Sequence, residues 1–109
     1  MRRDSIAREA SERFKRVVVA LDRGCIAETE GDPCEGLLHA HHVVTQQQLR
    51  DCGLFDDLWN PSVGAVVCER HHRRHHNRTQ PLRMSMLPGR CLLFAHHNDL
   101  GGYLDRYYA

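Results

Sequence analysis

The chain has 109 residues and a formal net charge of +1, and 41% of its residues are hydrophobic, 27% charged and 6% aromatic. This length predicts one domain, and the composition excludes a disordered chain. No apolar run is long enough to cross a membrane, and the charged N-terminus lacks the apolar centre of a signal peptide. We therefore expect a cytoplasmic protein whose five cysteines are thiols or metal ligands rather than disulfides.

The charges are distributed unevenly along the chain. Residues 24–57 carry seven acidic residues and one arginine, Arg50, whereas residues 69–90 carry six arginines and one acid, Glu69. A concentrated arginine stripe attracts polyanions even when the total charge is near zero, because the local field decides. The same pattern is found on solvated helix faces, so both interpretations stay open.

The first predicted element is a helix over residues 4–21. Its apolar residues recur at helical spacing, and Asp4 or Ser5 would cap it. Residues 30–36, EGDPCEG, follow as a turn-rich loop. The helix is expected to cover a small core.

The middle of the chain predicts strand, loop, strand and helix. Residues 37–44, LLHAHHVV, are short and apolar, which predicts a strand. Thr45 would then cap a short helix, with Gln48 three residues later as in a capping box. Residues 62–68, SVGAVVC, predict the second strand, and residues 69–78, ERHHRRHHNR, contain no helix breaker and predict a helix.

The C-terminal part, residues 82–109, predicts a helical extension. Its two segments, CLLFAHHNDL and GYLDRYYA, would be helices held apart by Gly101 and Gly102. The whole chain, 1–109, is thus expected to be one α+β domain with its core at about residues 22–78 and helices on both sides.

Three cysteines and one histidine have the composition of a structural zinc site. Cys25 and Cys34 flank the turn-rich loop, and Cys68 and His71 are separated by two residues. Such a set closes a tetrahedral site, and a bound zinc would add folding free energy to a small core. The alternative interpretation is ordinary buried cysteines. The two remaining cysteines have no expected role and would be small buried apolar residues: Cys52 and Cys91.

A second set of histidines has spacing that suits another ion. His72 and His76 are four residues apart, so they lie on one face of the predicted helix. The first predicted strand offers His39, His41 and His42. Three neutral imidazoles are a suitable ligand set for a transition-metal ion.

The run HAHHVV, then Asn60 within WNPSV, then VVCERHHRRHH, resembles the HNH endonucleases with the ββα-metal fold. It is most similar to the small phage and bacterial members that carry an added zinc knuckle, and the resemblance covers about residues 22–78. The chain departs from that family at His71, where a cysteine is usual, and in the eight residues between the first two cysteines. The resemblance implies a role for each of five residues: His41 as metal ligand, His42 as general base, Asn60 as the residue that fixes the loop and orients the base, and His72 and His76 as further metal ligands.

The resemblance also implies cofactors and partners. It implies a structural Zn²⁺ and one catalytic divalent metal, with Mg²⁺, Mn²⁺, Ni²⁺ and Zn²⁺ as alternatives. The implied partner is DNA, with phage packaging proteins or a second copy of the chain as further ones, in a bacterial or phage-infected cell.

The expected chemistry is hydrolysis of a phosphodiester bond. Neutral His42 can take a proton from water at pH 7, because the ordinary histidine pKa is near 6.5. Adjacent residues of a regular strand point to opposite faces. His41 and His42 can therefore share a site only at a strand end or at an irregularity.

Two function classes remain: a metal-dependent DNA endonuclease or nickase, and a non-catalytic zinc-stabilised DNA-binding module, which could be a packaging or recombination accessory protein. The pair His41 and His42, together with Asn60, favours the enzyme, because a binding module has no use for a free histidine beside a ligand. His75 would contact phosphate or water, whereas His39, His96 and His97 would be structural. Four arginines are expected to contact the DNA backbone: Arg70, Arg73, Arg74 and Arg78.

Overall fold

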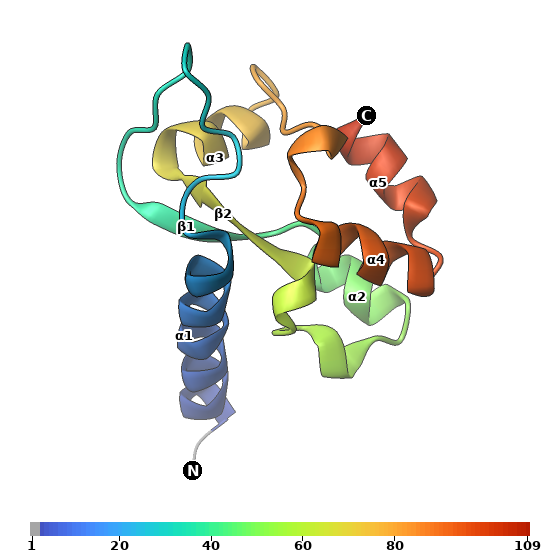
Figure 1. Cartoon of the computed structure of the whole chain (residues 1–109). Coiled ribbons are helices and arrows are strands. Elements are labelled where there is room, and N and C mark those ends of the chain that lie inside the picture. Colours follow the sequence, from blue (N-terminus) through green and yellow to red (C-terminus); the bar gives the residue numbers. More distant parts are fainter. Residues whose placement is uncertain (1–2) are drawn as a thin grey trace.

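The computed structural model describes residues 3–109, and its centre is an antiparallel pair of strands (Figure 1). Strand β1 (Leu38–His42) pairs with β2 (Gly64–Cys68) in a register that places Leu38 opposite Cys68 and His42 opposite Gly64. Strand β2 leads directly into helix α3 (Glu69–His76). The predicted order of strand, loop, strand and helix is confirmed, and the chain belongs to the α+β class.

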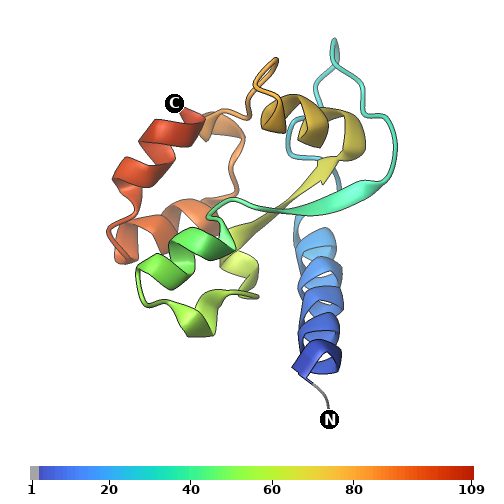
Figure 2. The same cartoon turned by 180° about the vertical axis from the view of Figure 1, so that it is seen from behind.

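The other helices surround this hairpin. Helices α1 and α3 lie on different sides of the strands, and α4 and α5 gather next to α2 at one end of the hairpin (Figures 1 and 2). No helix within residues 3–109 is long and apolar enough to cross a membrane. The bounds are α1 (Arg3–Asp22), α2 (Gln46–Asp51), α4 (Gly89–His97) and α5 (Gly101–Tyr108), with short 3-10 turns η1 (Phe55–Asp57), η2 (Pro61–Val63) and η3 (Met84–Met86).

The core is built around β2, all of whose residues are buried. Phe14 and Val18 of α1 pack against this strand, and Leu104 of α5 belongs to the same buried cluster. A side chain at Gly64 would overlap the ring of Phe14. The close approach of α1 to the hairpin therefore requires glycine at this position.

A partly buried ion pair joins α1 to α4 across the end of β2. Arg90 donates to both carboxylate oxygens of Asp22, at 2.6 and 2.9 Å. The same carboxylate accepts the backbone N–H of Val66 at 2.9 Å. Loss of Arg90 would leave the Asp22 carboxylate, whose side chain is 6% exposed, without its cation, which destabilises the fold.

Two of the predicted helix starts have different outcomes. Thr45 caps α2 as predicted, because its side chain accepts the backbone N–H of Gln48 at 3.1 Å. Helix α1 begins at Arg3, so Asp4 and Ser5 lie inside it rather than at its cap. The position before α1 lies outside the described residues.

Other boundaries shift by a few residues. The second strand begins at Gly64 because the segment Pro61–Val63 forms a 3-10 turn. The prediction that Gly101 and Gly102 separate the two C-terminal helices is wrong, since both glycines lie in the first turn of α5. The break between α4 and α5 lies earlier, where Asp99 has a left-handed backbone with φ of 56°.

Candidate metal centres

Among the described residues, two groups of side chains are close enough to hold a metal ion. The cysteine group consists of Cys25, Cys34, Cys68 and His71, and the histidine group consists of His41, His72 and His76. Both groups draw residues from α3, and their members there, His71 and His72, are adjacent in the chain.

The cysteine group brings together the four predicted zinc ligands. Their ligand atoms all lie within 4.8 Å of one another. The Nδ1 atom of His71 is 3.0 Å from the sulfur of Cys68, 3.7 Å from that of Cys25 and 3.9 Å from that of Cys34. Three sulfurs and one imidazole nitrogen are a donor set that suits tetrahedral zinc, so this group could hold a structural zinc.

The loop between the first two cysteines folds back on itself, which closes the eight-residue gap. An isolated bridge joins Thr29 to Asp32, and the backbone N–H of Ile26 donates to β2 at 2.9 Å. Gly36 has φ of 85°, and a side chain there would overlap Glu69 at the start of α3. Only glycine fits this contact between the loop and the helix.

The thiols of the cysteine group influence one another's ionisation. Burial raises the pKa of Cys68, but the backbone N–H groups of His71 and Glu35 and the His71 ring outweigh it and lower that pKa to about 7. Burial and the neighbouring Cys25 and Cys68 raise the pKa of Cys34 to about 12. Three adjacent thiolates repel each other, and a divalent cation would remove that repulsion.

Asp32 lies behind the histidine of the cysteine group, a role that the sequence did not reveal. Its Oδ2 is 2.9 Å from Nε2 of His71, the ring nitrogen that faces away from the sulfurs. The alignment falls short of a full hydrogen bond, and Nε2 has no other partner. Contact with His71, and then with Gln80 and Arg70, lowers the pKa of Asp32 to about 2. A carboxylate in this place orients a metal-binding imidazole and makes it more basic.

The histidine group is assembled from β1 and α3, as predicted. The ligand atoms of His41, His72 and His76 lie within 4.8 Å of one another, and the Nε2 atoms of His72 and His76 are 3.0 Å apart. Burial and the neighbouring imidazoles hold the pKa of His41 well below its usual value and lower that of His72 to about 4. His41 and His72 are therefore neutral at pH 7, which is the form of imidazole that binds a metal ion.

His39 contacts this group rather than the core. It shares a face of β1 with His41, and its Nδ1 atom lies 2.9 Å from Nδ1 of His72. Because the other nitrogen of His72 faces His76, His39 is placed to fix the orientation of the His72 ring.

Tyr108 of α5 holds the ring of His41 from the other side. Its hydroxyl is 2.9 Å from Nε2 of His41 and donates to the carbonyl of Val43 at 2.7 Å. A phenol has one proton, so the hydroxyl must accept the Nε2 proton of His41. His75 stacks on Tyr108 with ring centres 5.4 Å apart, and it accepts the backbone N–H of Leu82. The predicted exposed role of His75 is wrong, because α5 covers this residue.

His42, the predicted base, is the last residue of β1 and points to the other face of the hairpin. Its Nε2 atom donates to the carbonyl of Leu58 at 2.8 Å, so Nδ1 carries the lone pair. The ring stacks on Phe14, with centres 4.7 Å apart, and meets Trp59 edge-on. Burial lowers the pKa of His42, with the Leu58 bond opposing the shift, so the ring is neutral at pH 7.

Asn60 acts on His42 only through the loop. Its Oδ1 accepts the backbone N–H of Ser62 at 2.9 Å, and its Nδ2 donates to Asp57 at 3.0 Å. The group that contacts the His42 ring directly is therefore the carbonyl of Leu58 rather than the Asn60 amide. Asn60 fixes the loop that carries this carbonyl.

His41 and His42 line one cavity although they point to opposite faces of β1. This cavity has a volume of about 350 Å³, and His72 and His76 also line it. His42 reaches the cavity because β1 ends at this residue. A strand end is one of the two conditions under which His41 and His42 can share a site.

The predicted arginine stripe does not form one free face. Arg70 donates to Asp32 at 2.7 Å, and Arg74 donates to Gln80 at 2.8 Å, so both side chains are engaged within the protein. Arg73 and Arg78 are exposed. Cys52 differs from the prediction because it is exposed rather than buried, and His96 and His97 are exposed as well.

The fold and the cysteine group define a small α+β protein with a strand hairpin, a following helix and a donor set consistent with zinc binding. Comparison of the chain with models of known families, with curated proteins and with solved structures gave no match. The arrangement of the side chains is therefore the basis for assigning a function.

Proposed function

We propose that this protein is a metal-dependent DNA endonuclease or nickase of the HNH type, with His42 as the general base. One observation carries the proposal: an imidazole with a free Nδ1 lone pair lines the same cavity as three imidazoles that are close enough to hold an ion. The sequence resemblance and the order of hairpin and helix support the same assignment.

The proposed reaction is hydrolysis of a phosphodiester. The oxygen of a water molecule forms a bond to phosphorus, the bond from phosphorus to the leaving oxygen breaks, and the water's proton goes to Nδ1 of His42. The Leu58 carbonyl and the Phe14 ring hold His42 in the orientation for this transfer. A divalent ion bound by the histidine group would stabilise the charge that develops on the phosphate oxygens and the leaving oxygen.

The cysteine group has a supporting role in this proposal. A zinc ion there would tie the loop of residues 25–37 to the start of α3, the helix that carries His72 and His76. The exposed side chains of Arg73 and Arg78 are available to contact DNA phosphates, which positions the strand without reading its sequence.

Incubation of the purified protein with supercoiled plasmid tests this function. We expect nicked or linear plasmid with at least one of Mg²⁺, Mn²⁺, Ni²⁺ and Zn²⁺, and none with the folded His42→Ala variant. Plasmid that is bound but left uncut with every ion would overturn the proposal and favour the non-catalytic DNA-binding module.

A further inference from the structure

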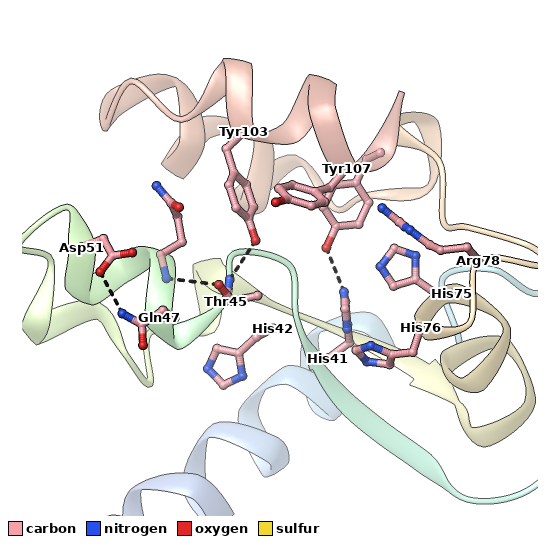
Figure 3. Close-up of a pocket in the computed structure, with 12 residues that line it drawn as sticks. His41, His42, Thr45, Gln47, Asp51, His75, His76, Arg78, Tyr103 and Tyr107 are labelled. Carbon is pink, nitrogen blue, oxygen red and sulfur yellow. Dashed lines mark hydrogen bonds between the residues drawn. The ribbon is translucent and has the colours of Figure 1, made fainter.

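A second cleft adjoins the proposed reaction site. It has a volume of about 410 Å³ and lies between α2, the end of α3 and α5 (Figure 3). His41, His42 and His76 form part of its lining, so a molecule in this cleft would touch the proposed base and two of the metal-binding imidazoles.

One wall of this cleft is aromatic and cationic. Tyr103 and Tyr107 project from α5 with ring centres 4.8 Å apart (Figure 3). The guanidinium group of Arg78, which lines the cleft, lies 5.9 Å from the centre of the Tyr107 ring, and that of Arg106, which does not line it, lies 5.5 Å from the same point. Tyr107 is 37% exposed, so part of this ring is open to a ligand.

The opposite wall consists of polar side chains of α2. Gln47 donates to Asp51 at 2.8 Å, and Gln48 also lines the cleft. Amide and carboxylate groups offer both donors and acceptors in this wall. The backbone N–H of Thr45 donates to the hydroxyl of Tyr103 at 3.3 Å, which links the two walls at their base.

These walls do not suit a phosphate chain alone, because the Asp51 carboxylate would repel it and the uncharged tyrosine rings would bind it only weakly. They suit a nucleobase, which can stack on an aromatic ring and can form hydrogen bonds with amide and carboxylate groups along its edge. Arg78, beside Tyr107, can then contact the phosphate of the same nucleotide.

We propose that the cleft binds one unpaired base of the strand whose phosphate lies at His42. This inference rests on the proposed function and deepens it, because it names the class of substrate. A base within a duplex is stacked and paired, and its removal from the helix is energetically unfavourable. The protein therefore prefers single strands, overhangs or mismatched sites to intact duplex.

Fluorescence anisotropy with two labelled probes of one sequence tests the proposal: a single-stranded oligonucleotide and the blunt duplex. All proteins carry His42→Ala to prevent cleavage. Tyr107→Ala should weaken single-strand binding at least about fivefold, the lower end for one stacked base, and leave duplex binding unchanged. Tyr107→Phe keeps the ring and should bind as the parent does. Phe55→Ala removes an exposed aromatic side chain outside the cleft and should change neither affinity.

Gln47→Ala on the opposite wall gives a second variant, which should weaken single-strand binding with little effect on the duplex. Unchanged single-strand binding in Tyr107→Ala, or an equal loss with both probes, would overturn the proposal. The plasmid assay distinguishes this proposal from the proposed function. Tyr107-dependent binding without any cutting would support the base-binding cleft and contradict the nuclease activity. Plasmid cutting, together with single-strand binding that is unchanged in Tyr107→Ala, would support the nuclease activity and contradict the base-binding cleft.

Discussion

The two metal-capable groups share α3 but differ in how they are enclosed. In the cysteine group Cys25, Cys68 and His71 are buried, and four donors complete a tetrahedral set. The histidine group has three donors, and His76 is exposed at a cavity. A closed site holds an ion for the fold, whereas an open one leaves positions for substrate and water.

His71 and His72 are adjacent in α3, so the position of the histidine group depends on the cysteine group. The reverse dependence is weaker. The cysteine group fixes the first turn of α3, so its loss would displace the histidine group. Loss of a ligand from the histidine group removes only a side chain that lines a cavity. We therefore expect that disruption of the cysteine group impairs the histidine group, whereas disruption of the histidine group leaves the cysteine group intact.

The largest effect is expected from the cysteine group. Cys25→Ser or Cys68→Ser should give an unfolded or insoluble protein, because structural zinc in small domains contributes about 10–16 kcal/mol of apparent binding free energy to folding. Zinc content and circular dichroism measure this. Soluble, zinc-free wild-type protein with a sharp melting transition would rule out a structural zinc.

His42→Ala should reduce plasmid cleavage roughly 10²–10⁴-fold, the usual contribution of a general base. Its metal content and melting temperature should stay close to those of the wild type, because His42 belongs to neither metal-capable group. The measurement is a cleavage rate alongside metal analysis. Parallel loss of bound metal would show that His42 is a ligand instead of the base.

His72→Ala should weaken Mn²⁺ or Ni²⁺ binding and cleavage together, while one tightly held zinc and the folded state remain. Isothermal titration with the ion, on protein that retains its zinc, measures the first effect. His97→Ala, an exposed histidine at the end of α4, is the matched control. Normal cutting by His72→Ala would exclude the histidine group as the reaction site.

Much of both groups could be predicted from spacing along the chain. Two histidines four residues apart must share a helix face, and Cys68 and His71 are brought together by the first turn of α3. The sequence could not predict partners that come from distant segments. Asp32 meets His71 from 39 positions away in the chain, and Tyr108 meets His41 from 67 positions away.

Exposure was the other property that spacing alone could not decide. The helical pattern places His75 on the same face as His71, but only the packing of α5 shows that this face is covered. Arg70 and Arg74 likewise share a face, and the loop of the cysteine group occupies it. Periodicity defines the faces of a helix, and tertiary contacts decide what each face meets.

Asp32→Asn should weaken zinc retention by about 10–100-fold, as is typical when the partner of a metal-binding histidine is removed. Competition with a chromophoric chelator measures the zinc affinity directly. Asp105→Asn, which changes an exposed carboxylate on α5, should leave it unchanged. Equal zinc affinity in the two variants would mean that His71 needs no orienting carboxylate.

The smallest effect separates two neighbouring arginines of α3. Residues of a helix are about 100° apart, so Arg73 lies about 60° from His76 around the axis and Arg74 about 160° from it. Arg73 is thus on the cavity side, whereas Arg74 faces Gln80 and Asp32. If DNA lies over the cavity, Arg73 neutralises a phosphate and Arg74 does not.

The salt dependence of duplex binding measures this difference, because each phosphate contact contributes a slope of about −0.9 through counterion release. On the His42→Ala background, Arg73→Ala should reduce the magnitude of the slope by about one, and Arg74→Ala should leave it nearly unchanged. An equal drop for both variants would place the DNA along the side of α3 that carries the cysteine group. A smaller slope for Arg74→Ala alone would mean that the DNA does not lie over the cavity of the histidine group. That result would contradict DNA as the substrate of this open site.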